Sequence, residues 1–296
     1  MRLLDICSAL VVIIVWGLNF IVIKSGVDEI PPLLLGALRF TLAAIPMVLL
    51  LPPPKVPLRL YLAYGLTISV GQFAFLFVAI HIGMPSGMAS LVLQSQVFFT
   101  MLLAAFWLKE AWHGHQLAGL ILAASGLIII ASTHGTNMPL MGFVCTLMAA
   151  LMWASGNIVT RMIATHGPIN QLAFVAWASL VPPLPFLGMS LAFEGQSAIE
   201  LALENISLHG LSVIAYLAWA ATLLGYGLWT RLLTRYPANL VAPFSLLVPV
   251  IGLSAGWLIY AEELNPANLA GSFLLVLGLV ANLFGGRWRT SLRNSS

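Results

Sequence analysis

Long apolar runs follow one another along almost the whole chain, and they decide what it can fold into. They lie near residues 4–24, 32–51, 59–81, 86–108, 115–132, 140–162, 170–192, 210–233, 238–260 and 267–286. A helix needs about 20 apolar residues to cross a bilayer, so each run is long enough to do so. The strands of a closed barrel are shorter and alternate in polarity. We therefore expect an all-α integral membrane protein with ten transmembrane helices.

The composition excludes a water-soluble domain of any size. Of 296 residues, 60% are hydrophobic and 7% are charged, whereas soluble domains carry roughly 25% charged residues. The net charge of +3 predicts no nucleic-acid partner, because the basic residues are spread along the chain and form no basic face. Cys7 and Cys145 fall near opposite membrane faces, so no disulfide is expected between them. Membrane lipid is the expected surrounding, and the oligomeric state is not indicated.

The charged residues at the ends of the runs predict the orientation. If the chain starts in the cytoplasm and crosses ten times, the cytoplasmic side receives Arg2, Lys55, Arg59, Lys109, Arg161, Arg231, Arg235, Arg287, Arg289 and Arg293. The other side receives Lys24 and the acids Asp28, Glu29, Glu194, Glu200, Glu204, Glu262 and Glu263. Loops rich in Lys and Arg stay in the cytoplasm. Both termini, including a short basic tail at 287–296, are therefore expected to be cytoplasmic.

The chain matches itself at two offsets, which predicts an internal duplication of residues 4–132 and 140–286. At an offset of 137, Trp16 falls on Trp153 and Pro46 on Pro183. At an offset of 152, Tyr64 falls on Tyr216, Glu110 on Glu262 and Gly126 on Gly278. Each copy holds five spans, an odd number, so the second copy must cross in the opposite sense. Inverted repeats of this kind are typical of secondary transporters, which bind substrate near the midplane between the copies.

Several stretches resemble the EamA family of the drug/metabolite transporter superfamily. They are WGLNFIVIK (16–24), LRF (38–40), GMPSGMASLVLQSQVFFT (83–100), the spacing from Glu110 to Leu117-Ala118-Gly119, and VAPFSLLVPVIG (241–252). The resemblance covers essentially the whole chain. It implies ten helices, a bacterial inner-membrane location and efflux of small amino-acid metabolites, with O-acetylserine and cysteine as the first substrates to test. Members of the family differ in substrate, so the resemblance alone implies only transport.

Polar residues that occur in one copy and not in the other are the best candidates for lining a substrate cavity. Arg39 is matched by Ala176, Gln72 by Leu224 and Gln94 by Leu246. A polar group that serves the fold tends to recur in both copies, whereas a substrate without twofold symmetry can use groups present in one copy. We therefore predict Gln72 and Gln94 as substrate-binding residues, with hydrogen bonding between helices as the alternative.

Arg39 is the one charged residue well inside a predicted span, about 10 Å from its start at 1.5 Å per residue. Its planar guanidinium suits bidentate binding of a carboxylate, so it is a candidate clamp for an amino-acid substrate. Two alternatives remain open from the sequence. The side chain can extend to the membrane interface, or it can brace the backbone of neighbouring helices.

In the fourth run, Ser86, Ser90 and Gln94 recur every four residues and share one helix face. We predict that Ser90 and Gln94 line the cavity. Gln96 lies about 200° around a regular helix from Gln94, so it is expected to pack against a neighbouring helix instead.

Aromatic and amide residues near the middle of other spans complete the predicted site. Trp16 with Asn19, and Trp153 with Asn157, each share a helix face. Tyr226 is a candidate hydroxyl, and Pro249 is a candidate because it frees a backbone carbonyl. The alternatives are packing for the aromatic residues and a helix bend for the proline.

The absence of certain groups from the spans narrows the function. No Asp or Glu falls in the middle of a run, and all six histidines lie near run ends or in loops, which favours facilitated efflux over proton antiport. The chain has no metal-ligand cluster, phosphate loop or activated nucleophile, so neither a cofactor nor an enzymatic reaction is expected. The predicted function is export of small amino-acid metabolites by alternating access. An exporter of aromatic or hydrophobic amino acids or drugs is the alternative within this class, and a passive channel or membrane enzyme is the alternative outside it.

Overall fold

The computed structural model describes residues 1–107, 109, 114–132, 138–167, 169–236, 241–262 and 266–293. Within these ranges the regular structure is helical, and no strand is present. The first part of the chain forms α1 (Leu3–Val27), α2 (Pro32–Leu50), α3 (Leu58–Tyr64), η1 (Gly65–Gly71), α4 (Gln72–His81), α5 (Ser86–Val92), η2 (Leu93–Ser95), α6 (Gln96–Trp107) and α7 (Gly114–Ser132). The second part forms α8 (Leu140–Ala164), α9 (Gln171–Ala178), α10 (Pro183–Phe193), α11 (Gln196–Glu204), α12 (Leu208–Ala215), η3 (Tyr216–Leu224), α13 (Gly225–Arg235), η4 (Ala242–Leu246), α15 (Leu247–Tyr260) and α16 (Pro266–Arg293).

The described helices confirm an all-α protein that crosses the membrane several times. Eight segments are long and apolar enough to span a bilayer: Leu3–Val27, Pro32–Leu50, Leu58–His81, Ser86–Trp107, Gly114–Ser132, Leu140–Ala164, Gln171–Phe193 and Leu208–Trp229. The last two predicted spans correspond to shorter apolar helices, Phe244–Tyr260 and Pro266–Asn282. Ten spans therefore remain a prediction. Glu110 and Glu263, used in the sequence argument, lie outside the described residues.

The sequence predicts regular helices, but several of these segments are irregular. The segments η1 and η3 are π-helical, and η2 and η4 have 3-10 geometry. The hydroxyl of Thr222 in η3 donates to the carbonyl of Leu217, five residues earlier, at 2.8 Å. Single-turn π segments and 3-10 turns leave backbone groups outside the regular hydrogen-bond pattern and often occur at functional sites.

The predicted span 170–192 is interrupted at Ser179, where α9 ends, and α10 begins at Pro183. Pro182 and Pro183 have no backbone N–H to continue the helix, and each disfavours helical geometry in the residue before it. Pro46, the predicted repeat partner of Pro183, lies inside α2 without ending it. The short helix α11 lies between α10 and α12.

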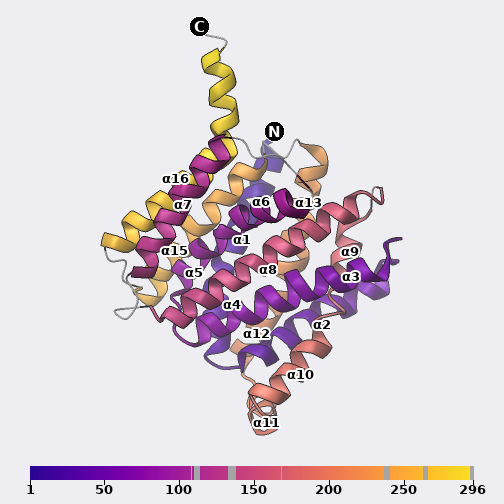
Figure 1. Ribbon diagram of the computed structural model, residues 1–296. Helices are drawn as coiled ribbons and strands as arrows, with labels where there is room; N and C mark the ends of the chain where they lie inside the picture. Colours follow the sequence, from indigo (N-terminus) through magenta and orange to yellow (C-terminus); the bar gives the residue numbers. More distant parts are fainter. Residues whose placement is uncertain are drawn as a thin grey trace.

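The helices pack in a single bundle (Figure 1). Helix α1 packs against α15, η3 and α13, and α8 packs against α4, η1 and α6. Helix α2 contacts α9 and α10, and α5 contacts α15. Helices α7 and α16 lie side by side along one edge of the bundle in Figure 1. They contact each other far more than they contact any other element. The elements that carry the predicted site residues therefore surround the middle of the bundle.

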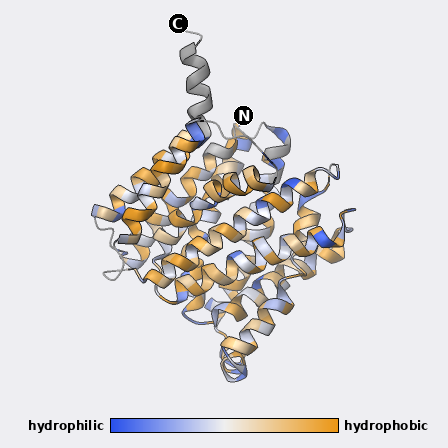
Figure 2. Cartoon of the chain, viewed as in Figure 1, coloured by the Kyte–Doolittle hydropathy of each residue, from blue (hydrophilic) through white to orange (hydrophobic). Residues whose placement is uncertain are grey.

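The outside of the bundle is apolar over most of its height (Figure 2). Leu49, Phe106, Leu184 and Phe193 are each 78% exposed or more. In water such a surface would drive aggregation, whereas in a bilayer the lipid chains cover it. The bundle buries polar groups as well, among them Asn19, Arg39, Gln72, Ser90 and Gln94. The bundle thus buries polar side chains and presents an apolar surface, as expected for a protein in lipid.

Candidate functional site

A cavity of about 580 Å³ lies between the helices near the middle of the bundle. This volume lies within the range of about 300–1,000 Å³ found for small-molecule sites. Its walls include all the predicted site residues except Pro249: Trp16, Asn19, Arg39, Gln72, Ser90, Gln94, Trp153, Asn157 and Tyr226. Further lining residues that the sequence argument had not selected include Tyr64, Thr160, Gln171, Phe174, Trp229 and Ser245. The structure thus brings the predicted residues of both halves of the chain to one cavity.

Aromatic rings form one wall of this cavity. The ring centroid of Trp16 lies 5.3 Å from that of Tyr226 and 5.5 Å from that of Trp229. The indole N–H of Trp16 donates to the carbonyl of Ala221 in η3 at 3.0 Å. Gly225 is necessary here, because a Cβ at that position would overlap the indole ring. Trp16 therefore pairs with a carbonyl of the π-helical segment and at the same time contributes its ring to the wall.

Gln94 reaches across the cavity wall to the partner segment η4. Its side-chain amide donates to the backbone carbonyl of Ser245 at 3.2 Å. In a regular α-helix this carbonyl would accept from the N–H four residues later, but that residue is Pro249, which has none. Pro249 itself is buried and does not line the cavity, where Val248 takes the place predicted for it. Pro249 affects the site through the carbonyl of Ser245 rather than through its own side chain.

Gln96 and Asn157 form a second polar contact between helices. The amide of Asn157 donates to Oε1 of Gln96 at 2.8 Å and to the hydroxyl of Thr100 at 3.0 Å. The prediction that Gln96 packs against a neighbour is therefore correct. The further expectation that it cannot face the same space as Gln94 is wrong, since both line the cavity. Gln94 lies within the 3-10 turn η2 and Gln96 directly follows it, so the angle of a regular helix does not apply.

Arg39 is buried, with 2% of its surface exposed. Its Nε and Nη2 donate to the hydroxyl of Thr222 at 3.3 and 3.1 Å. The guanidinium carbon lies 4.0 Å from the centroid of the Phe73 ring, close enough for attraction to the ring face. The alternative in which Arg39 extends to the membrane interface is wrong. The contact with Thr222 supports a bracing role, but Nη1 is buried without a hydrogen-bond partner.

Asn19 and Gln72 also carry buried polar atoms without partners, namely Oδ1 and Oε1. Ser90 is different, because its hydroxyl donates to the carbonyl of Gly87 at 2.6 Å. Ser86, on the same helix face, does not line the cavity and instead donates its hydroxyl to Glu262 at 2.6 Å. Asn19, Arg39 and Gln72 thus retain hydrogen-bonding capacity that the protein does not use.

One end of the bundle is closed by three carboxylates, and we call it the Glu262 end. Glu262 accepts from the backbone N–H groups of Ser86 and Gly87 at 2.7 and 2.9 Å and forms an ion pair with Lys24 at 3.2 Å. Glu194 and Glu29 complete the set by accepting N–H groups at the starts of α2 and α12. Each carboxylate satisfies N–H donors that a helix start leaves free. None of these three acids was predicted to bind helix starts from the sequence.

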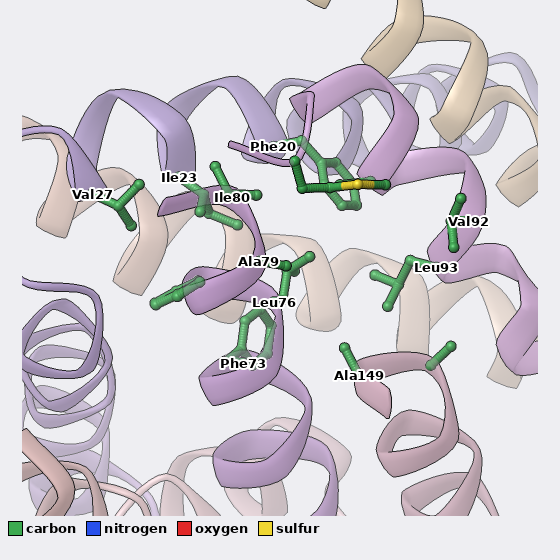
Figure 3. Close-up of a cluster of buried hydrophobic side chains, with 14 of the residues drawn as sticks. Phe20, Ile23, Val27, Phe73, Leu76, Ala79, Ile80, Val92, Leu93 and Ala149 are labelled. Atoms are coloured by element: carbon green, nitrogen blue, oxygen red, sulfur yellow. The ribbon is translucent and has the colours of Figure 1, made fainter. Parts of the chain in front are cut away.

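A cluster of buried apolar side chains (Figure 3) borders the cavity and extends to Val27, at the end of α1 that carries Lys24, the ion-pair partner of Glu262. Residues from α1, α4, α5, η2 and α8 meet in it: Phe20, Ile23, Val27, Phe73, Leu76, Ala79, Ile80, Val92, Leu93 and Ala149. Phe20, Phe73, Leu76 and Leu93 also line the cavity. In the opposite direction the lining continues to Ile163, near the end of α8, and to Gln171, at the start of α9. The cavity therefore borders this packed cluster on one side and extends, on the other, to the end of α8 and the start of α9.

The fold and the cavity define a multi-pass helical membrane protein with a central cavity of the size found for small-molecule sites. The profile of the EamA-like transporter family matches residues 3–132 and again residues 140–284. The chain belongs to this family.

Relatives of the same length support this assignment. The chain is 50% identical over 290 residues to a protein of Salmonella typhimurium and 46% identical over 291 residues to one of Escherichia coli K12, and both are named "Probable amino-acid metabolite efflux pump". Each match covers 97% of both chains. A solved crystal structure shares the fold with a TM-score of 0.65 at 19% identity, covering 95% of this chain and 96% of that one. The protein is a transmembrane transporter similar to efflux proteins.

Proposed function

We propose that this protein exports small amino-acid metabolites, O-acetylserine and cysteine among them, across the bacterial inner membrane by alternating access. The observation that carries the proposal is the cavity of about 580 Å³ between helices of both halves of the chain. Support comes from the two relatives named for amino-acid metabolite efflux, which match over nearly their full length. The cavity is large enough for one amino acid with several water molecules.

The proposed mechanism rests on two inverted repeats, and the packing supports them. The contacts of α1 with η3 and α13 correspond to those of α8 with η1 and α4 when the two halves are exchanged. The π-helical segments are also equivalent, because η1 follows Tyr64 and η3 begins at Tyr216, 152 residues later. Two similar halves can exchange conformations, which gives two states of similar energy that open to opposite sides.

The positive-inside rule supports placing both termini in the cytoplasm and the Glu262 end outside. In this orientation the carboxylates and the apolar cluster of Figure 3 close the outer side, and the cavity extends toward the cytoplasm. The structure then corresponds to a state that loads substrate from inside the cell. Release requires the Glu262 end to open.

The lining of the cavity favours facilitated efflux. No Asp, Glu or His is among the described residues that line it. Proton-coupled transporters commonly use such groups as relays. A solute gradient from cytoplasm to outside is therefore the simplest driving force.

One observation favours a second candidate, an exporter of aromatic or hydrophobic amino acids or drugs. The aromatic lining residues are Trp16, Phe20, Tyr64, Phe73, Trp153, Phe174, Tyr226 and Trp229. Aromatic walls bind apolar side chains well. The polar groups Arg39, Gln72, Gln94 and Asn157 on the same cavity favour the smaller polar substrates.

Transport into vesicles tests the function directly. Purified protein is reconstituted, the vesicles are loaded with unlabelled L-cysteine or O-acetylserine, and entry of the labelled compound is followed. We expect saturable counterflow, in which the internal substrate accelerates entry of the label. A flux that does not saturate would indicate a channel, and a new chemical product would indicate an enzyme. Preference for tryptophan or phenylalanine would favour the second candidate.

A further inference from the structure

Three side chains on the cavity wall carry buried polar atoms that the protein leaves without partners. They are Nη1 of Arg39, Oδ1 of Asn19 and Oε1 of Gln72. A buried polar atom without a hydrogen bond is costly, and native proteins contain few of them. The other two such atoms among the described residues belong to Ser95 and Ser272, which do not line the cavity. The unsatisfied capacity on the wall is therefore one cationic donor and two neutral acceptors.

The cation of Arg39 lacks a counter-ion. The described residues place no carboxylate within ion-pair distance of it, and its hydrogen bonds go to the hydroxyl of Thr222. Charges inside a membrane protein are costly unless they are paired, and they commonly mark a substrate path. A guanidinium with a free N–H binds a carboxylate by charge-assisted hydrogen bonds. The missing partner is therefore an anion, and a carboxylate has the matching geometry.

The oxygens of Asn19 and Gln72 are acceptors and carry no charge. An ammonium group has three N–H donors and no acceptor, so amide oxygens on one wall suit it. Neutral acceptors let an ammonium group bind without making the empty cavity anionic.

All three residues come from one half of the chain. In the proposed repeat alignment, their counterparts in the other half are Gly156 for Asn19, Ala176 for Arg39 and Leu224 for Gln72. None of these counterparts has an ionic or amide side chain. A feature needed only by the repeated fold would tend to occur in both halves, whereas an asymmetric ligand requires an asymmetric set of groups.

We propose that this cavity recognises the zwitterionic head of a free α-amino acid. Arg39 binds the carboxylate, and the amide oxygens of Asn19 and Gln72 accept hydrogen bonds from the ammonium group. The inference deepens the proposed function and rests on it. Compounds that lack either charged group are poor substrates, whatever their side chain.

Three thiols that share the same two-carbon unit between sulfur and nitrogen test the assignment. L-Cysteine has both groups, cysteamine lacks the carboxylate, and N-acetyl-L-cysteine lacks the ammonium. Each competes, under reducing conditions, with labelled L-cysteine in counterflow into vesicles that contain the full chain. We expect cysteine to compete at least about tenfold better than either analogue, since losing a charge-assisted hydrogen bond typically has an effect of that size or more. Equal competition by all three compounds would overturn the proposal.

Substitutions test which residues bind the carboxylate and which bind the ammonium group. Arg39→Gln should weaken competition by cysteine at least about tenfold and leave competition by cysteamine unchanged, so that the preference for a carboxylate disappears. Arg39→Lys should restore part of this preference. Asn19→Leu and Gln72→Met should instead reduce the preference for cysteine over N-acetyl-L-cysteine. A purely structural role for Arg39 would weaken all three compounds together, and that result would contradict the assignment.

Thr222→Val serves as a second variant if Arg39→Gln does not fold, because it removes the hydroxyl that holds the guanidinium and keeps the charge. It should weaken cysteine more than cysteamine. Ser125→Ala, on the exposed face of α7, is the matched control and should behave as wild type. Thermal stabilisation of the purified protein by the same three compounds provides a readout independent of transport.

Failure of this inference is distinguishable from failure of the proposed function. Wild-type protein that exchanges cysteine without discriminating the analogues would contradict the recognition alone. Wild-type protein that neither exchanges nor is stabilised by any free amino acid would contradict both.

Discussion

The side-chain amide of Gln94 donates to the backbone carbonyl of Ser245, 3.2 Å away, in the segment where Pro249 removes the regular helical donor. This contact joins the two halves of the chain at the cavity wall. Gln94 also faces the cavity, and its predicted counterpart Leu246 has no polar side chain.

Gln94→Leu should lower transport about fivefold, because the substrate loses a polar contact worth about 1 kcal/mol and the Ser245 carbonyl loses the Gln94 donor. The amount of folded protein should change little, since leucine has a similar size and suits the bundle. The initial rate of cysteine counterflow, normalised to the amount reconstituted, measures the effect. Unchanged transport would remove Gln94 from the site, and Ser125→Ala is the control.

The edge pair α7 and α16 depends on close backbone contact. A Cβ on Gly126 would lie 2.5 Å from the carbonyl oxygen of Gly271, and one on Gly119 would lie 2.6 Å from that of Gly278. Gly126→Ala should therefore separate the helices and destabilise the protein by about 1–3 kcal/mol. Thermal unfolding in detergent measures this loss. Gly188→Ala, in α10 with nothing within 4 Å, should have no such effect, and equal stability of the two variants would contradict the close-packing argument.

The sequence predicts the helical spans well because a run of about 20 apolar residues in a membrane protein is explained by a helix that crosses the bilayer. It also predicts most of the cavity, because polar residues inside spans are few and Arg39, Gln72 and Gln94 have no polar match in the other half. It could not predict that Gln96 faces the same cavity, since that depends on the 3-10 turn η2. Local geometry of this kind is set by packing between distant segments, which residue spacing does not report.

The same limit explains two other differences. Pro249 was selected for its freed carbonyl, and the structure shows that this carbonyl belongs to Ser245 and faces Gln94. Glu262 was used to count charges and to align the repeats, and the structure shows that it joins the end of α15 to the start of α5. Both relationships depend on contacts between residues more than 150 positions apart, and a single sequence contains no direct signal for them.

The carboxylate of Glu29 should make the stability of the folded protein depend on pH. The backbone N–H of Ser207 donates to its carboxylate at 2.9 Å, and this bond, helped by the Ser207 hydroxyl and by His209, lowers the pKa of Glu29 from its ordinary value of 4.5. A lowered pKa in the folded state means that the contribution to stability is present above pH 4.5 and is lost as the pH falls through the folded-state value.

Glu29→Gln should therefore lower the thermal midpoint of unfolding near neutral pH, and the difference from wild type should shrink below pH 4.5. The group is largely solvated, so the free-energy difference should be small, about 0.3–1 kcal/mol, and should decrease with salt. Melting curves between neutral and acidic pH measure it. Glu204→Gln, at the exposed end of α11, is the control, and a difference independent of pH would argue against the carboxylate.

The Glu262 end provides the most direct test of alternating access. Glu262 holds together Lys24 of α1 and the N–H groups of Ser86 and Gly87 in α5. Glu262→Gln keeps the size of the side chain but removes the ion pair and weakens the hydrogen bonds, because a neutral amide oxygen is a poorer acceptor than a carboxylate. If this end must open for release, the variant should populate the open state more often.

Accessibility of a cysteine at position 90 reports the opening, because Ser90 is 1% exposed and lies on the cavity wall one helical turn from Ser86, which donates to Glu262. In a background with Cys7→Ser and Cys145→Ser, a membrane-impermeant thiol reagent added outside right-side-out vesicles should label Ser90→Cys several-fold faster when Glu262→Gln is also present. Glu200→Gln, which alters an acid that accepts a hydrogen bond from Gln196 within α11, should leave the rate unchanged. Equal labelling in all three proteins would mean that Glu262 does not hold this end closed, and the opening step would have to depend on the apolar cluster around Phe20 and Leu93 instead.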